Sequence, residues 1–584
     1  MASDRASDRI PDRVGRFVLV ASFVAGAAAC AHDDPRRFAL RAPVVRDQDL
    51  ETVQITCKGK LEDCTMEEYE SSFAWDAADN SLFRPPSEFF RVKRAGVAKN
   101  INAFDEVPDS SWFINRIGNA PMTPQEVFDG FCKPGPMLDP TAEDGSWLID
   151  HGKDNGANPG FRVKFKDVKY MMKTDESQGE RATAATAISA RFYYAAGWWA
   201  PCDAVVYFKR SLLKLKSGLS IKANVGPARN FDEKLLTEIL EKTSKRGDTF
   251  RAAASRWLPG KALGPFTYDG KRDDDPNDVI PHEDRRDLRG ARVLAAWLNH
   301  FDSREQNSMS TWENPDPKAP NVGYVRHWYI DMGDSFGSEW AVDGFSRRHG
   351  YTYILDFRYL LEDFFTLGIP SRPWDDKTKR TPGAEDFGYF TAKYFRPDEW
   401  KGEYPNPAFQ NLQEGDAAWA TRIIARFTPK HVEAAVDAGD LTKPEHRKFL
   451  LDTLFERQKI LLRRYFSKLS PVSDVTVEAG QVCAVDLARK TETYDSSSFR
   501  YAASAVRGTS KSIERPAVVT QEAGRVCFPL APQGPDEGVR DDDVSRYVVV
   551  KLTNGSTPGP LMLHFYDLGP KRGLKLVGIE RPES

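Results

Sequence analysis

The stretch Phe161-Arg162-Val163-Lys164-Phe165-Lys166-Asp167-Val168-Lys169-Tyr170-Met171-Met172-Lys173 decides the first part of the fold. Its apolar residues predict two strands, 161–165 and 170–173, joined by a turn at Lys166-Asp167. A helix is expected over 180–196, because this segment is rich in alanine, carries apolar residues on one face and stops at a glycine. Another strand is expected at 204–208. The order strand, helix, strand predicts an α+β fold around Lys173.

The chain after this block predicts a second, mostly helical region. Residues 251–266 read as a strand followed by a hinge at Pro259-Gly260 and Gly264-Pro265. Apolar residues at helical spacing predict a helix over 282–299, which breaks into the polar run Asn299 to Asn307. A strand at 323–330 then delivers Asp331-Met332-Gly333, where the glycine is expected to let the backbone turn away. Residues 410–469 are expected to be mostly helical.

The pattern changes at Pro471. Short apolar runs separated by turn residues are typical of an all-β sandwich. They lie at 475–477, 482–487, 517–519, 526–530, 547–552, 561–566 and 574–579.

The N-terminus has the layout of a secretory signal peptide. Four arginines precede the apolar run 17–29, which has thirteen residues, whereas a membrane-spanning helix needs about 20. A permanent anchor is therefore the weaker interpretation. Ala27-Ala28-Ala29-Cys30 resembles a bacterial lipobox, which predicts lipidation of Cys30 and attachment to the cell envelope. Ala27 stands where the lipobox usually has a larger aliphatic residue, so simple cleavage and secretion is the alternative.

The cysteines agree with export. Besides Cys30 there are six, an even number that permits three disulfides in an oxidising compartment. Proximity in the sequence suggests Cys57 with Cys64 and Cys483 with Cys527, the latter facing each other across the sandwich, and leaves Cys132 with Cys202. Free buried thiols are the alternative. The cysteine and histidine spacings predict no structural zinc site.

Composition excludes several classes of protein. The chain has 584 residues, of which 40% are hydrophobic and 29% charged, which excludes a disordered, collagenous or polytopic membrane protein. The formal charge is 82 − 85 = −3 with the signs interspersed. Nucleic acid is therefore not an expected partner.

Residues along the middle of the chain, about 150 to 470, carry a resemblance to a known superfamily. They are Lys173 at the end of a strand, Glu180 opening the next helix, Asp302 and Asn307 in Asp-x-x-x-x-Asn, and Asp331 in Ile-Asp-Met-Gly. In this order they resemble the protein-kinase-like superfamily, closest to HipA-type bacterial kinases and phosphoinositide lipid kinases. The resemblance implies a bilobal kinase-like core, with a small β-rich N-lobe and a helical C-lobe.

The resemblance also implies roles for these residues, with ATP and Mg²⁺ as cofactors. Lys173 would hold phosphate and Glu180 would orient it, Asp302 would meet the acceptor hydroxyl, and Asn307 and Asp331 would hold the metal. The chain departs from the family in two places. It has no glycine-rich loop of the protein-kinase spacing, for which Gly152, Gly156 and Gly160 with Lys153 offer an alternative cradle. Inside the helix, Thr183 and Thr186 stand where the family has its acidic residue.

Two other functions compete with phosphotransfer. An exported protein meets little ATP, so the core could be catalytically silent and bind a partner or glycan, or use another phosphate compound. The adjacent pair Trp198-Trp199 is interpreted as a packed edge rather than a ligand platform. The run Gly333-Asp334-Ser335-Phe336-Gly337 fits a hydrolase nucleophile elbow, with Ser335 as nucleophile and a histidine as base. The candidate bases are His349, His431 and His446.

The predicted domain organisation has six parts. They are a signal peptide (1–29), a tether with a small cysteine loop (30–85), an N-terminal extension (86–150), an N-lobe (151–270), a helical C-lobe (271–470) and a β-sandwich (471–584).

Overall fold

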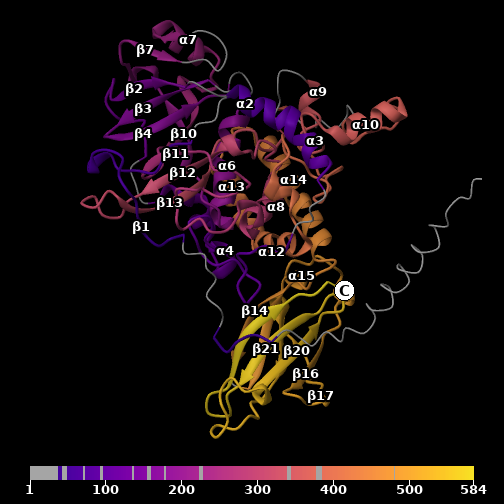
Figure 1. Ribbon diagram of the computed structural model, residues 1–584. Coiled ribbons are helices and arrows are strands. Elements are labelled where there is room, and N and C mark those ends of the chain that lie inside the picture. Colours follow the sequence, from indigo (N-terminus) through magenta and orange to yellow (C-terminus); the bar gives the residue numbers. More distant parts are fainter. Residues whose placement is uncertain are drawn as a thin grey trace, which may run out of the picture.

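A computed structural model gives the fold as a mixture of helices and several sheets (Figure 1). It describes residues 37–41, 49–69, 73–91, 96–133, 137–153, 159–175, 179–221, 228–337, 343–375, 384–387, 389–478 and 480–583. The predicted α+β class and the all-β C-terminal region are confirmed. No helix within these ranges combines the length and the apolar character needed to cross a membrane.

The block around Lys173 forms the largest sheet, which is antiparallel except where β2 meets β6. Its strand order is β5-β10-β4-β3-β2-β6, with β9 beside β10. The bounds are β2 (Trp147–Gly152), β3 (Gly160–Phe165), β4 (Val168–Lys173), β5 (Asp203–Phe208), β6 (Leu213–Leu215), β9 (Lys245–Arg246) and β10 (Thr249–Arg256). The predicted hairpin is confirmed, because Lys166 and Asp167 both have positive φ, as a two-residue hairpin turn requires.

Alternation along these strands separates a packed face from a face that lines a cavity. Tyr170 and Met172 are buried in a core that includes Leu236 of α7 (Glu233–Glu241), a helix packed beside the small hairpin β7 (Leu219–Ile221) and β8 (Arg229–Phe231). Met171 and Lys173 have the opposite parity and line the cavity. The predicted helix after Lys173 is confirmed as α6 (Arg181–Ala196), which is buried along nearly its whole length and contacts both β5 and β10.

A linker at residues 257–260 leads from β10 to a second sheet. The order of this sheet is β1-β13-β12-β11. Its strands are β1 (Val53–Gln54), β11 (Lys261–Gly264), β12 (Ser308–Glu313) and β13 (Val322–Tyr329). The strand predicted at 323–330 is thereby confirmed, and the predicted hinge is the point where the chain passes from one sheet to the other.

Helices form most of the remaining core. The predicted helix at 282–299 is α8 (Arg286–Leu298), preceded by the short turn η5 (His282–Asp284). The helical region at 410–469 is also confirmed, and Trp419 and Leu454 are among its fully buried residues. The other helices are α9 (Asp343–Ser346), α10 (Phe357–Thr366), α11 (Pro407–Gln410), α12 (Glu414–Ile424), α13 (Pro429–Asp437) and α14 (Pro444–Tyr465).

The C-terminal region consists of two sheets whose facing side chains share one apolar core, as a sandwich requires. One sheet has the order β14-β15-β19-β18 and the other β17-β16-β20-β21-β22. The strands are β14 (Val472–Glu478), β15 (Gln481–Asp486), β16 (Ala502–Arg507), β17 (Ile513–Glu514), β18 (Val519–Thr520), β19 (Arg525–Pro529), β20 (Tyr547–Thr553), β21 (Leu561–Asp567) and β22 (Leu574–Glu580), with the short helix α15 (Leu487–Lys490) after β15. The sequence analysis missed β16 and β17.

The three suggested disulfides are all present: Cys57–Cys64, Cys132–Cys202 and Cys483–Cys527. One detail of the prediction is wrong. Cys483 and Cys527 do not face each other across the sandwich, because they are directly opposed residues of the neighbouring strands β15 and β19 in a single sheet.

The N-terminal part contains more helix than the sequence predicts. A continuous helical segment at residues 73–89 spans the end of the expected tether and the start of the expected N-terminal extension. It consists of α2 (Phe73–Ala78), a π-helical turn (Asp79–Phe83) and α3 (Arg84–Phe89). Further on, α4 (Arg116–Asn119) and α5 (Pro124–Asp129) lie in the predicted N-terminal extension, 86–150. In α5, Thr123 and Glu126 form a reciprocal capping box. Phe38 packs on the sandwich and accepts a hydrogen bond from Tyr566.

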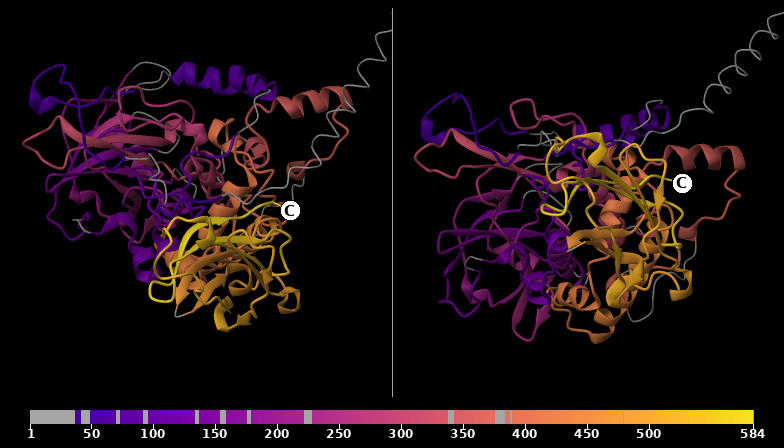
Figure 2. Two further views of the ribbon diagram at one scale, coloured as in Figure 1. Left: turned by 60° about the horizontal axis from the view of Figure 1, so that its bottom comes forward. Right: turned by 90° about the horizontal axis from the view of Figure 1, so that it is seen from below.

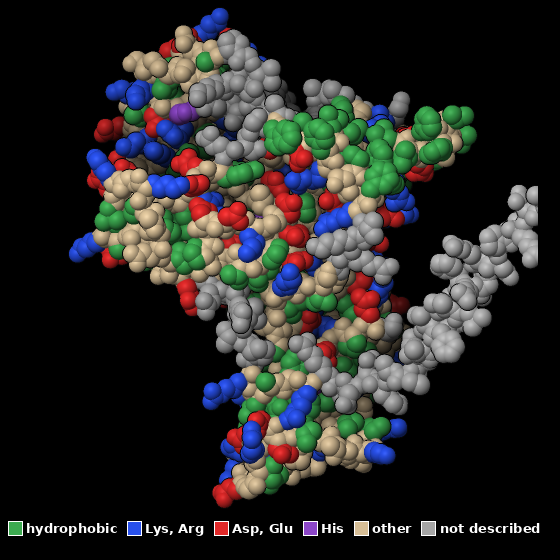
Figure 3. Space-filling model, in the orientation of Figure 1, with side chains coloured by type: hydrophobic (Ala, Val, Ile, Leu, Met, Phe, Trp, Pro, Cys, Tyr) green, Lys and Arg blue, Asp and Glu red, His purple; other side chains and the backbone are tan. Residues whose placement is uncertain are grey.

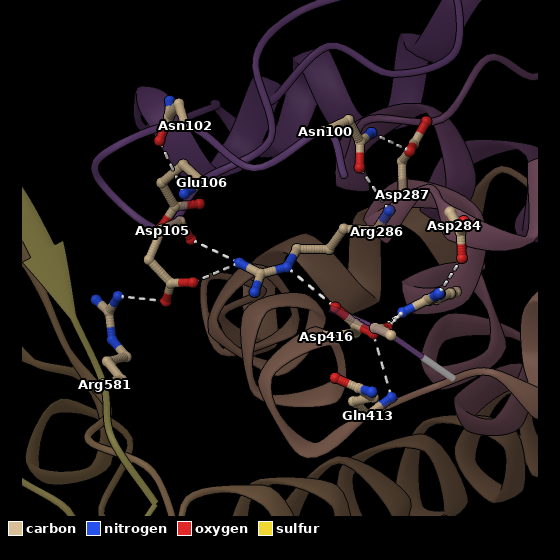
Figure 4. Close-up of polar contacts among 12 residues, drawn as sticks. Asn100, Asn102, Asp105, Glu106, Asp284, Arg286, Asp287, Gln413, Asp416 and Arg581 are labelled. Carbon is tan, nitrogen blue, oxygen red and sulfur yellow. Dashed lines mark hydrogen bonds and ion pairs between the residues drawn. The ribbon is translucent and has the colours of Figure 1, made fainter. Parts of the chain in front are cut away.

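A buried charged network joins the sandwich to the helical region. Asp105 pairs with Arg286 of α8 at 2.5 Å, with Arg581 just after the last strand at 2.7 Å, and with Arg422 of α12 at 3.4 Å. Figure 4 shows Arg286 between Asp105 and Asp416, with Arg581 approaching Asp105 from the sandwich. Burial alone would raise the pKa of Asp105, but the arginines hold it well below its ordinary value.

Candidate functional site

A cavity of about 410 Å³ lies where the largest sheet meets the second sheet. Met171, Lys173 and Ser255 contribute to it from β4 and β10, Trp257 and Leu258 from the linker, and Met309 and Thr311 from β12. Ile330 and Asp331 close it at the end of β13. Apolar side chains predominate near the linker, although the Arg162 guanidinium also lies over the Trp257 ring there, and Lys173 and Asp331 form a charged end where β4 and β13 end.

Lys173 and Asp331 form an ion pair at the charged end. The Lys173 Nζ lies 2.6 Å from the Asp331 carboxylate, although the two residues are far apart in sequence. Burial alone would lower the pKa of Lys173, but Asp331 outweighs it and raises that pKa. Burial would likewise raise the pKa of Asp331, yet Lys173 and Lys153 hold it well below the ordinary range. Both side chains are therefore charged near neutral pH.

The backbone at Asp331 is the special feature of this turn. Asp331 itself has a left-handed φ of 54°, so the backbone turns away from the strand at Asp331. The expectation that Gly333 provides this turn is therefore wrong. Ile330 donates its N–H to the carbonyl of Asn307 at 3.0 Å. This bond places the loop that carries Asp302 and Asn307 alongside Asp331.

Asp302 is buried in a small cluster with Arg304 and Glu403. The Arg304 guanidinium lies 3.0 Å from one oxygen of each carboxyl group. Burial raises the pKa of Asp302 well above its ordinary value, and a hydrogen bond with Glu403 and the charge of Asp331 add to this, whereas Arg304 opposes it. Asp302 therefore takes up a proton more readily than an ordinary carboxyl group.

Asn307 is fixed by the same loop. Its Nδ2 donates to the carbonyl of Asp302 at 2.8 Å, which leaves the side-chain oxygen as the atom available to a ligand. The neighbouring His300 is buried against the Tyr193 hydroxyl at 2.9 Å, and burial lowers its pKa to about 4. His300 is thus a neutral support of the loop.

The expected phosphate cradle is described only in part. Lys153 lines the cavity, and its charge helps to keep Asp331 ionised. Gly160 lies so close to β4 that a Cβ atom there would stand 2.1 Å from the Met172 carbonyl oxygen. This position therefore requires glycine for strand pairing. Gly156 lies outside the described residues.

The carboxylate of Glu180 binds Thr442 rather than Lys173 in this structure. Glu180 is the residue before α6, and its carboxylate accepts hydrogen bonds from the backbone N–H and the hydroxyl of Thr442, each at 2.8 Å. The next residue, Arg181, instead reaches the site: it donates to the Gly333 carbonyl at 2.9 Å and lies 3.7 Å from Asp334. The start of α6 therefore contributes a cation to the turn after Asp331.

Asp203 is an acidic residue of the site that sequence reasoning missed. It opens β5, is buried, and lies directly opposite Ser255 on β10, so it shares a sheet face with Lys173. Neither carboxylate oxygen has a well-formed hydrogen bond within the described residues, although the Ser255 hydroxyl is close enough to act on it. Burial raises the pKa of Asp203 to about 6, against the opposing effects of Ser255 and Lys173.

The geometry around Ser335 does not favour a hydrolase. Its Oγ is buried and makes no hydrogen bond within the described part of the chain. The three candidate bases are engaged elsewhere: His349 stacks on Phe301, His431 binds the Met122 carbonyl, and His446 lies 3.2 Å from Asp386. Trp198 and Trp199 are buried, in agreement with their interpretation as a packed edge.

Neither clustered metal-ligating side chains nor similarity to known proteins identifies the site. Among the described residues, no group of three or more His, Cys, Asp or Glu side chains is arranged to hold a metal ion. No family model, curated protein or solved structure matches the chain.

Proposed function

We propose that this protein is an exported phosphotransferase with a kinase-like bilobal core. The observation that carries the proposal is the ion pair of Lys173 with Asp331 at the end of a cavity, with the Asp302 to Asn307 loop held alongside. These residues come from separate elements and were singled out from their order in the sequence.

The order of elements supports a kinase-like core. In protein kinases the phosphate-binding lysine lies on the third strand of the small lobe, and a helix follows it. Here Lys173 ends β4, the third strand of the largest sheet in chain order, and α6 follows. The linker 257–260 then leads toward α8 and the loop with Asp302, which corresponds to the passage between two lobes. This largest sheet with α6 would be the small lobe.

The cavity fits a nucleotide or a similar phosphate donor. The apolar side chains of Trp257, Leu258 and Met309 suit a flat base, and Lys153, Lys173 and Arg162 supply cations. A bound Mg²⁺ would neutralise charge on the transferring phosphate. Asp331 and the Asn307 side-chain oxygen suit this ion, which binds through one or two protein oxygens together with substrate phosphate.

The transfer step assigns one proton to Asp302. The acceptor hydroxyl oxygen forms a bond to the terminal phosphorus of the donor, the bond from that phosphorus to the bridging oxygen breaks, and the hydroxyl proton passes to the Asp302 carboxylate. A raised pKa makes this carboxylate a better base once it is ionised. Arg304 and a hydrogen bond with Glu403 hold Asp302 in place.

The acidic partner of Lys173 during binding would be Asp203 rather than Glu180. When a metal and phosphate occupy Asp331, Lys173 needs another carboxylate to keep its ammonium group in position. Asp203 lies on the same face, and its charge acts on Lys173; within the described part of the chain its carboxylate has no well-formed hydrogen bond.

Nucleotide-dependent stabilisation tests this function. For the chain without residues 1–29, Mg²⁺ with ATP is expected to raise the free energy of unfolding by about 2.7 kcal/mol at a hundredfold excess over the dissociation constant. Asp331→Ala should abolish the Mg²⁺-dependent shift, measured against its own unliganded melting curve. Ser335→Ala should retain it.

The outcome separates the competing functions. If neither nucleotides nor polyphosphate shift the melting curve, the core is a silent binding module of the envelope. Covalent labelling of Ser335 by a fluorophosphonate would instead support a hydrolase.

Localisation to the envelope is a second part of the proposal. Three disulfides support folding outside a reducing compartment, and the lipobox-like sequence supports an acyl anchor. Cys30 itself lies outside the described residues. The wild-type chain expressed in a bacterium should fractionate with membranes and carry acyl chains on Cys30, whereas Cys30→Ser should not. A mature N-terminus at Ala31 or beyond, found by mass spectrometry, would contradict the anchor and indicate a secreted protein.

A further inference from the structure

Large apolar side chains are exposed together on two helical segments that contact each other. α3 and α10 meet where the ring of Phe357 lies 5.2 Å from Phe89 and 5.9 Å from Phe90. Hydrophobic side chains gather over this part of the surface in Figure 3. We call this surface the apolar ridge; its exposed members are Trp75, Leu82, Phe83, Phe89, Phe90, Leu360, Phe364, Phe365, Leu367 and Ile369.

The most exposed part of the ridge is the end of α10. The exposed fractions are 74% for Phe364, 77% for Phe365, 87% for Leu367 and 83% for Ile369. Leu367 has a left-handed φ of 54° and ends the helix, while Gly368 donates its N–H to the Asp363 carbonyl at 3.0 Å. The chain therefore turns back on itself, and the apolar residues on both sides of the turn form one tip.

Charges near the tip are paired with each other. Arg372 lies 2.8 Å from the carboxylate of Glu362 and 2.7 Å from that of Asp363. Tyr359 holds the helix to the body, because its ring packs against Trp374 and lies under the Arg372 guanidinium. Among the described residues, these polar contacts involve Tyr359, Glu362 and Asp363 of α10, whereas Phe364, Phe365 and Leu367 stay largely exposed.

The shape of the tip and the length of chain between Cys30 and Phe38 favour a lipid bilayer as the partner of the apolar ridge. α10 projects from the body in Figure 1 and in both views of Figure 2, so the tip is convex. A convex apolar tip needs no matching pocket in order to enter the interface of a lipid bilayer. From Cys30 to Phe38, which is bonded to the sandwich by Tyr547 and Tyr566, the chain has eight residues and spans at most about 30 Å. An acyl group on Cys30 would therefore keep the whole body close to the membrane.

We propose that the apolar ridge is a second membrane contact, whose tip inserts Phe364, Phe365, Leu367 and Ile369 into the lipid surface. The proposal rests on the envelope localisation inferred above, but it does not require the acyl group. Insertion removes exposed apolar surface from water, which is favourable. The body is thereby held in a fixed orientation on the membrane, which a single acyl group at one point does not provide.

A fluorescent label can locate the tip. In the full chain with Cys30→Ser, the six remaining cysteines are paired, so Phe365→Cys introduces the one reactive thiol for an environment-sensitive NBD label. Vesicles of phosphatidylcholine and phosphatidylglycerol should shift its emission to the blue and raise its intensity at least twofold. Brominated lipids should quench it. A label at Ile513→Cys on the exposed edge of the sandwich should not respond.

A matched variant tests the role of the neighbouring side chains. Phe364→Ser, Leu367→Ser and Ile369→Ser together, in the Phe365→Cys background, should abolish the vesicle response and leave the melting curve unchanged, because these side chains are exposed. Label emission is the readout because the apolar run 17–29 also binds lipid. An unresponsive label in the parent would overturn the proposal. A response without lipid that grows with protein concentration would assign the ridge to contacts between copies of the chain. Failed acylation of Cys30 leaves this test unaffected.

Discussion

Asp302→Asn is expected to lower the rate of phosphoryl transfer by about 10²-fold to 10⁴-fold, which is the usual contribution of a positioned general base. The amide has the size of the carboxylate but cannot accept the proton of the acceptor hydroxyl. Binding of the donor should change little, because Asp302 does not line the cavity that Lys173 and Asp331 close. The measurement is single-turnover transfer from ATP, or from whichever phosphate donor shifts the melting curve.

The control for this variant is Ser335→Ala. Ser335 is buried nearby, and its hydroxyl makes no hydrogen bond within the described residues, so the rate should stay within about twofold of wild type. Equal rates for wild type and Asp302→Asn would remove Asp302 from the mechanism. Loss of donor binding in the same variant would mean instead that the cluster with Arg304 and Glu403 supports the cavity.

Asp105→Ala is expected to lower the free energy of unfolding by about 3–5 kcal/mol, the cost of breaking a buried ion pair by removing one partner. Arg286, Arg422 and Arg581 would remain buried near one another without their shared carboxylate. Because Arg581 follows the last strand of the sandwich, the variant should also weaken the attachment of that domain. Denaturant unfolding, followed separately by tryptophan fluorescence and far-UV circular dichroism, measures both effects.

The matched control is Asp541→Ala, which breaks the exposed pair with Arg572 and should cost no more than about 1 kcal/mol. The pH dependence gives a further check. Since the arginines hold the pKa of Asp105 below its unfolded value, its contribution to stability is complete above about pH 4 and is lost as the pH falls further. A variant as stable as wild type at pH 7 would contradict the role of this network.

Local patterns in the sequence were sufficient for much of the fold. The hairpin around Lys166-Asp167 and α6 follow from residues that are close in sequence, and the same holds for most strands of the sandwich. β16 was missed because its run Ala502 to Arg507 is poor in large apolar residues. The helical segment before residue 90 was missed for the opposite reason: its large apolar residues are exposed, so they form no pattern of a buried face.

The sequence was sufficient to pick out the candidate-site residues that lie in short motifs. It was not sufficient for the side chains that other elements bring to Lys173 and Asp331. The order of Lys173, Asp302, Asn307 and Asp331 was enough to suggest that they act together, and Lys173 indeed lies on Asp331. From the sequence, the acidic partner of Lys173 is expected to be Glu180, at the start of the helix that follows Lys173. Asp203 and Arg181 were not considered, because only the pairing of β5 with β10 and the packing of α6 bring them to the site.

The disulfide between Cys132 and Cys202 affects when the proposed site around Lys173 can be completed. Cys202 immediately precedes Asp203, so the bond that fixes the start of β5 also fixes the carboxylate proposed to serve Lys173. In the cytoplasm, where thiols stay reduced, this strand end lacks its covalent tie to the segment before β2. If the chain is exported as proposed, oxidation of this cysteine pair would follow export, and the site would be completed only after the chain has left the compartment in which it is made.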